Sequence, residues 1–63
     1  MKIIVNGSCR EIASGTMLRD LLQSFRDQKS VVVGEVNGHV PFDEDVLLSD
    51  DDCVEIVTFV GGG

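Results

Sequence analysis

The residues of this 63-residue sequence that could do chemistry are two cysteines, one histidine, two runs of acids and a closing run of glycines. Cys9 and Cys53 belong to no CxxC pair and have no histidine at metal-ligand spacing, so we expect two free thiols in a reducing compartment. Nothing near either thiol would stabilise a thiolate, and the sequence assigns neither a role. His39 has no partner for a nucleophile dyad or a metal site, which predicts a surface residue in a hairpin.

The two acidic runs are Asp43-Glu44-Asp45 and Asp50-Asp51-Asp52. A calcium loop of the EF-hand type needs spaced oxygen ligands, a central glycine and a distal glutamate, and neither run has that pattern. We therefore predict a solvated acidic face and no metal site. Since no nucleophile, base or metal site is assembled anywhere in the sequence, we expect a chain that is not an enzyme.

The remaining candidate is the last stretch, in which Thr58–Val60 passes into Gly61, Gly62 and Gly63. Glycine has no Cβ, so such an end is thin and flexible enough to enter a narrow tunnel with its α-carboxylate first. The alternative is a frayed end without function. A carboxylate becomes an acyl donor once its oxygen is made a leaving group, usually by transfer to AMP from ATP. Attack of a sulfur nucleophile on that acyl-adenylate would leave a thiocarboxylate.

Length and charge limit the kinds of partner. A domain of this size buries only about 60% of the surface that its unfolded chain exposes, so an enclosed active site is not expected. The net charge is −6, and all five basic residues precede position 30. The acidic second half repels phosphate and anionic headgroups, which argues against nucleic acid and membrane surfaces and favours a basic protein. Without a membrane-spanning run or a signal-peptide pattern, a cytoplasmic location is expected.

The first element that would position the tail is a β-hairpin, predicted for residues 1–12. Asn6-Gly7 is the strongest short hairpin signal, because both residues accept a positive φ. Its two-residue loop places Lys2 opposite Glu11 as an exposed cross-strand pair, with Ile4 on the same face. The other face, which we expect to enter the core, carries Ile3, Val5 and Ile12.

An amphipathic helix is predicted next, because apolar residues recur at the i, i+3, i+4 and i+7 positions of one helical stripe. The stripe consists of Leu18, Leu21, Leu22 and Phe25. We expect Thr16 to be the N-cap, and Arg26 and Lys29 to lie near the negative end of the helix dipole. The stripe itself is expected to be core.

A third strand is predicted at Val31–Val36, followed by a second Asn-Gly pair at residues 37–38. This turn directs the chain back towards His39 and Val40, and Pro41 ends the pairing because it has no N–H to donate. Residues 42–48 are irregular by pattern. The chain then enters its longest apolar run.

The last strand, Cys53–Val60, determines the predicted topology. Its alternation places Val54 and Ile56 in the core and leaves apolar residues on the outer face, which suggests a docking surface beside a reactive tail. The predicted docking residues are Ile4, Val57, Phe59 and Val60, with Ile4 expected to lie beside Val57. The simplest architecture is α+β, with one mixed sheet wrapped around one helix and the last strand central, parallel to the first. Residues 1–60 would form this domain, and 61–63 a flexible tail.

In these features the sequence resembles the small β-grasp sulfur carriers of thiamine biosynthesis, the ThiS family, over nearly its whole length. The motifs that carry the resemblance are Met1–Gly7, Leu21-Leu22, Glu35–Gly38 with Val40-Pro41, and Val54–Val57 leading to Phe59–Gly63. The sequence departs from the family at Asp51, where glycine is common, and at Phe42, where a basic residue often follows the proline.

The resemblance implies a ubiquitin-like β-grasp fold and a reactive carboxylate at Gly63, with Gly61 and Gly62 threading into the partner. It implies adenylation by an E1-like adenylyltransferase of the ThiF type, which uses ATP, while the carrier itself binds no cofactor. It also implies a sulfur donor such as a cysteine desulfurase, and delivery of sulfur to a thiazole synthase of the ThiG type. Three alternatives stay open: a molybdopterin-synthase small subunit, a ubiquitin-like protein modifier, and a β-grasp interaction module without tail chemistry.

Overall fold

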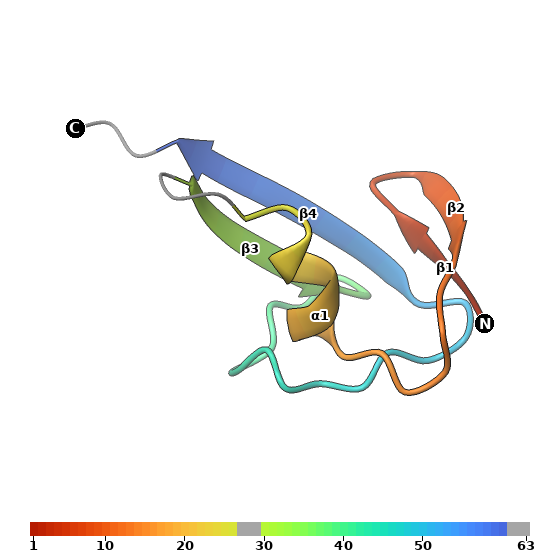
Figure 1. Ribbon diagram of the computed structural model, residues 1–63. Coiled ribbons are helices and arrows are strands. Elements are labelled where there is room, and N and C mark those ends of the chain that lie inside the picture. The colour runs from red at the N-terminus through yellow and green to blue at the C-terminus, as the bar shows by residue number, and fades with distance from the viewer. Residues whose placement is uncertain (27–29, 61–63) are drawn as a thin grey trace.

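The computed structural model describes residues 1–26 and 30–60 (Figure 1). Their elements are β1 (Lys2–Val5), β2 (Ser8–Glu11), α1 (Leu18–Gln23), β3 (Ser30–Val36) and β4 (Cys53–Val60). The strands form one mixed sheet in the order β2-β1-β4-β3. β4 runs parallel to β1 and antiparallel to β3. The prediction that the last strand is central and parallel to the first is confirmed.

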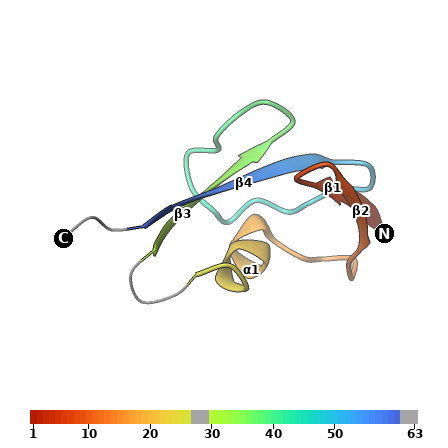
Figure 2. The same cartoon turned by 90° about the horizontal axis from the view of Figure 1, so that it is seen from above.

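The helix lies on one side of the sheet, as Figure 2 shows in the view from above. A helix of six residues is too short to be stable in isolation, so α1 depends on the apolar side chains that it packs against the strands. The buried apolar side chains of the described residues are Ile3, Val5, Leu18, Leu21, Leu22, Val32, Leu48, Val54 and Ile56. The core therefore contains most of both predicted faces, with Ile12 and Phe25 only partly buried against it. It also contains Leu48, from the stretch whose sequence is irregular.

The hairpin of β1 and β2 has the predicted register, with Val5 opposite Ser8. Its turn residues, Asn6 and Gly7, have φ values of +49° and +83°. Two positive φ angles in succession are what a two-residue turn between twisted antiparallel strands requires. Local turn chemistry thus determines this part of the fold.

The ion pair of this hairpin differs from the expected one. Lys2 stands opposite Glu11 in register, as predicted. The carboxylate of Glu11, however, lies 3.8 Å from the ammonium group of Met1, which is its ion-pair partner in the described structure. The pair is exposed on the side of Glu11, so its contribution to stability is small.

The N-terminus of α1 is satisfied by the loop between β3 and β4. The N–H of Leu18 donates to the carbonyl of Val46 at 2.8 Å, and the N–H of Arg19 donates to the carbonyl of Glu44 at 2.9 Å. The first N–H groups of any helix have no acceptor within the helix. Carbonyl groups distant in sequence supply the acceptors here, and no side chain is needed as a cap.

The predicted cap at Thr16 is therefore wrong. Its hydroxyl donates to the carbonyl of Ala13 at 2.7 Å, and the N-cap residue is Met17. The N–H of Met17 donates in turn to the carboxylate of Asp20 at 2.9 Å, one turn into the helix. Lys29, expected near the other end of the helix, lies outside the described residues.

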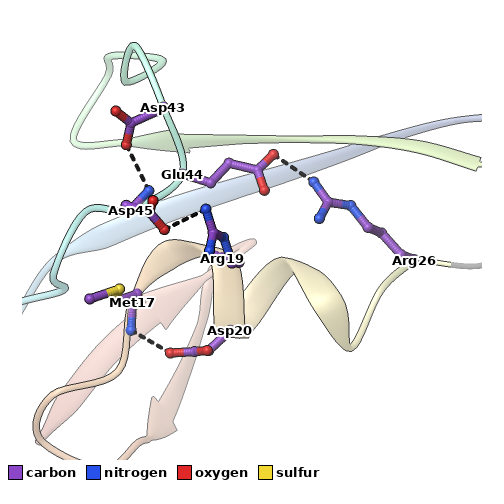
Figure 3. A network of polar contacts seen from close by, with 7 residues as sticks. All are labelled: Met17, Arg19, Asp20, Arg26, Asp43, Glu44 and Asp45. Carbon is purple, nitrogen blue, oxygen red and sulfur yellow. Dashed lines mark hydrogen bonds and ion pairs between the residues drawn. The ribbon is translucent and has the colours of Figure 1, made fainter.

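Two ion pairs connect the loop between β3 and β4 to α1 and to the segment that follows it (Figure 3). Arg19 contacts Asp45 at 2.6 Å, and Arg26 contacts Glu44 at 2.5 Å. Arg26 is thus used for this loop, not for the helix dipole. The carboxylate of Asp43 accepts from the N–H of Asp45 at 2.8 Å. These acids are exposed or half-buried, in agreement with the predicted solvated face, and they also hold the loop against the helix.

The turn after β3 is tight, but the residues directly after it do not form a strand. Asn37 and Gly38 have φ values of +51° and +86°. Val36 and His39 exchange two backbone hydrogen bonds, of 2.8 and 3.0 Å, and form an isolated bridge. The predicted pairing that continues to Pro41 is wrong: after the single bridge at His39 the described chain does not pair with the outer edge of β3, which stays the edge strand of the sheet.

The side chain of Asn6 extends the pairing of β1 with β4 beyond the end of β1. Its Oδ1 accepts from the N–H of Ile56 at 2.7 Å, while the backbone N–H of Asn6 donates to the carbonyl of Val54 at 2.9 Å. β1 ends at Val5, so without this amide the N–H of Ile56 would lack a partner in a part-buried position. A turn residue of the hairpin thereby also holds the central strand.

Gly34 allows α1 to lie close to β3. A Cβ at this position would lie 2.9 Å from Cδ1 of Leu18 and 3.0 Å from Cδ2 of Leu22. Both leucines are buried, so neither methyl group has free space to move into. α1 therefore crosses β3 at Gly34, where glycine leaves room for the two leucines.

We predict that Gly34→Ala lowers the free energy of unfolding by about 1–3 kcal/mol, because the added methyl group overpacks the contact with both leucines. Urea denaturation measures the change. The double variant Gly34→Ala with Leu18→Val should lose less than the sum of the two single losses, since valine removes the nearest methyl group. An unchanged midpoint in the single variant would contradict the close approach.

We predict that Asn6→Gly lowers the free energy of unfolding by about 1–3 kcal/mol, because the N–H of Ile56 loses its acceptor. Glycine accepts the positive φ at this position, so the loss reports the hydrogen bond and not backbone strain. Asn6→Asp is the matched control: it keeps the oxygen acceptor and should be clearly more stable than the glycine variant. Equal stability of the two variants would show that the side-chain bond contributes nothing.

Candidate docking face and reactive end

The outer face of the sheet, opposite α1, carries an apolar patch near the end of β4. Register pairs Val31 with Phe59, and Val33 with Val57, so each pair shares a face as direct neighbours. Val31, Val57 and Phe59 are 59%, 48% and 56% exposed, and Val33 is half-buried. We call Val31, Val33, Val57 and Phe59 the apolar patch. Nothing among the described residues covers it.

Alternation along the last strand predicts the exposure of Val57 and Phe59, which is confirmed. The contributions of Val31 and Val33 are not evident from the sequence. An unbroken run of valines has no alternation, so it does not show which side chains face outward. The register with β4 is the signal that identifies them, and that register comes from tertiary structure.

Two acids lie directly beside the apolar patch. Glu35 and Glu55 stand opposite one another across β3 and β4, one pleat before the pair of Val33 and Val57. Glu55 is exposed and Glu35 is half-buried. In the part of the chain that the structure describes, neither carboxylate forms an ion pair. The outer face is therefore apolar towards the end of β4 and negatively charged next to it.

Ile4, predicted beside Val57, lies elsewhere on this face. Its register partners are Cys53 on β4 and Cys9 on β2. Position 53 is four residues before Val57 on the same strand, a separation of about 13 Å at the rise of a β-strand. Ile4 is 39% exposed. The expected position is wrong, because the parallel register between the first and last strands cannot be read from either strand alone.

Both cysteines are free, as predicted, and both are exposed. Cys9 and Cys53 lie on strands separated by β1, with Ile4 between them in register. Two strand spacings place their Cα atoms about 10 Å apart, which exceeds the reach of a disulfide bond. The thiols therefore do not bridge within this fold.

The second acidic run builds a turn. Asp50 accepts the N–H of Lys2 at 2.7 Å, and Asp52 accepts the N–H of Ser49 at 2.8 Å. Within residues 1–26 and 30–60, no group of three or more histidine, cysteine or acidic side chains could hold a metal ion. No helix of the described chain is long and apolar enough to cross a membrane.

The reactive end predicted from the sequence follows β4 directly. The side chain of Val60 and residues Gly61, Gly62 and Gly63 lie outside the described residues. The flexible tail, the threading glycines and the docking role of Val60 therefore stay predictions. Phe59 precedes Gly63 by four residues in the sequence.

One mixed sheet packed over a single helix, with the last strand central beside the first, defines a ubiquitin-like β-grasp protein. A model of the ThiS family matches residues 3–63, so the chain belongs to the ThiS family, whose members are small sulfur carriers. Membership implies interaction with an E1-like enzyme and with a sulfur-transfer partner. A search of curated proteins found no significant match.

Proposed function

We propose that this protein is the sulfur carrier for thiazole formation in thiamine biosynthesis, with the carboxylate of Gly63 as its reactive group. The observation that carries the proposal is the family match, which extends through the three glycines to residue 63. An exposed apolar patch lies on the strand that leads into those glycines, which supports docking and reaction by a single partner.

The proposed chemistry takes place on the terminal carboxylate. An oxygen of Gly63 attacks the α-phosphorus of ATP and displaces pyrophosphate, which gives an acyl-adenylate. The outer sulfur of a persulfide then attacks the acyl carbon and AMP leaves, which gives an acyl disulfide. A thiol attacks the other sulfur of this bond, a disulfide forms, and the thiocarboxylate is released. ATP binds to the partner, an E1-like adenylyltransferase of the ThiF type, and the carrier needs no cofactor of its own. Gly61 and Gly62 thread the tail because glycines have no side chains to obstruct a narrow channel.

The apolar patch supplies the proposed docking surface for the adenylyltransferase. Burial of Val57 and Phe59 against a partner removes apolar area from water without altering the core, which lies on the other face of the sheet. Val60 continues the same strand, whereas Ile4 forms a separate apolar position near its start. A cysteine desulfurase supplies the sulfur that forms the thiocarboxylate, and a thiazole synthase of the ThiG type receives it in a later step.

We predict that Val57→Asp weakens binding to the adenylyltransferase by about tenfold or more, because a charge replaces a contact at the centre of the patch. The free energy of unfolding should change by only about 0.5 kcal/mol, since the side chain is half exposed. Titration calorimetry measures binding, and thermal melting measures stability.

Leu47→Asp is the matched control for this substitution. Leu47 is 59% exposed in the loop between β3 and β4, and its backbone pairs with that of Met17, directly before α1. The same charge there should leave binding unchanged. Equal loss of affinity in both variants would mean that net charge, and not the apolar patch, determines docking.

We predict that one residue added after Gly63 abolishes ATP–pyrophosphate exchange with the adenylyltransferase. The extension converts the reactive carboxylate into an amide and moves the new terminus beyond the position of attack. The melting temperature should not change, because Ile56 is the last buried core residue in the part of the chain that the structure describes. Unchanged exchange, with the added residue shown by intact mass to be present, would refute the proposal.

Intact mass also separates the proposed function from its alternatives. A sulfur carrier purified from its own cells should show replacement of one terminal oxygen by sulfur. A protein modifier would give adducts of higher mass with target proteins, and an inert interaction module would give neither product.

A further inference from the structure

We propose that Glu35 and Glu55 form an anionic clamp that selects the activating partner by binding an arginine beside the partner's apolar docking residues. The inference rests on the proposed function, because it names the chemistry that the adenylyltransferase must present to the apolar patch. It adds a charged, specificity-determining contact to a docking surface that otherwise recognises only apolar area.

The geometry places two like charges in direct opposition. Glu35 and Glu55 are register partners in an antiparallel ladder, so their Cβ atoms lie about 5 Å apart on the outer face. Like charges in that arrangement destabilise a sheet. The free protein therefore retains an unfavourable contact that a cation from outside would relieve.

The described chain offers no cation of its own at this place. Arg19 and Arg26 are paired with acids of the loop that lies against α1. The guanidinium of Arg10 lies 5.9 Å from the centre of the Phe25 ring. Lys2 stands on β1 opposite Glu11, away from the β3 and β4 pair. Each basic side chain of residues 1–26 is thus committed or placed elsewhere.

A second copy of the chain does not fit this face. In a face-to-face dimer with parallel strands, the two pairs of Glu35 and Glu55 would oppose one another. With antiparallel strands, each pair would lie over the Val31 and Phe59 end of the other copy. Neither arrangement compensates for the loss of water around four carboxylates. The acids therefore protect the exposed apolar patch from self-association and leave it available to a partner that brings positive charge.

Arginine suits the clamp better than lysine does. Its planar guanidinium donates in several directions at once and can bridge two neighbouring carboxylates, whereas the lysine ammonium is a compact and strongly hydrated point charge. Arginine is also more weakly hydrated, so it tolerates the adjoining apolar surface of Val33 and Val57. The inferred occupant is an arginine flanked by apolar side chains on the adenylyltransferase.

The test uses the single variants Glu35→Gln and Glu55→Gln of the full chain. Each should raise the melting temperature of the free protein by about 2 °C, because like-charge repulsion is removed. Each should also weaken binding to the adenylyltransferase by about tenfold. Between about 50 mM and about 300 mM salt, the affinity of each variant should fall less steeply than that of the unaltered protein. A higher melting temperature together with weaker binding would identify carboxylates that destabilise the free protein but contribute to binding of the partner.

Asp43→Asn is the matched control. It removes the same charge in the loop against α1 and keeps an oxygen that accepts from the N–H of Asp45. Its affinity and its salt dependence should equal those of the unaltered protein. If the control loses as much affinity as the glutamine variants, net charge is responsible and the clamp is refuted.

Other outcomes would also refute the clamp. Unchanged affinity in both glutamine variants, together with weakened binding of Val57→Asp, would refute the clamp while leaving the proposed function intact. Self-association of the unaltered protein that Val57→Asp abolishes would show that a second copy occupies the patch. Failure of the proposed function itself is detected separately, by exchange that persists after extension beyond Gly63.

Discussion

The approach of α1 to β3 at Gly34 is the contact on which the rest of the structure depends. Because this residue lacks a side chain, Leu18 and Leu22 fill the space above it and the helix lies close to the sheet. In this position close to the sheet, the first N–H groups of α1 donate to carbonyls of the loop between β3 and β4. That loop also contributes Leu48 to the core and leads into β4, so one missing side chain positions both the helix and the central strand.

Features encoded by neighbouring residues could be predicted from the sequence. Two Asn-Gly pairs determine two tight turns, and strict alternation determines which side chains of β4 face outward. Features that depend on distant residues could not. The first N–H groups of α1 donate to the carbonyls of Val46 and Glu44, which lie far along the chain. The local sequence pattern offers only the adjacent Thr16 as a cap. The position of Ile4 depends on a parallel register that neither strand encodes alone.

The two departures from the family differ in their structural basis. Asp51 has a φ of +69°, in the left-handed region that glycine adopts without strain, which explains why glycine is common at this place. Aspartate tolerates that region better than most residues do, and the N–H of Asp51 still donates to the carbonyl of Lys2 at 2.7 Å. Phe42 is fully exposed, and nothing in the structure explains its presence where a basic residue is common.

β4 has eight residues and β1 has four, and in the parallel register both strands begin near the same end of the sheet. Beyond Ile56, therefore, β4 pairs only with β3, and the two strands continue as a ribbon (Figure 1). Two-stranded ribbons twist more strongly than wide sheets and are weaker when isolated. Phe59 therefore lies near the tip of a two-stranded extension, and Val32, opposite Thr58, is the buried side chain that ties this extension to the core. Bending of the extension beyond Val32 would change the direction in which the chain leaves the sheet.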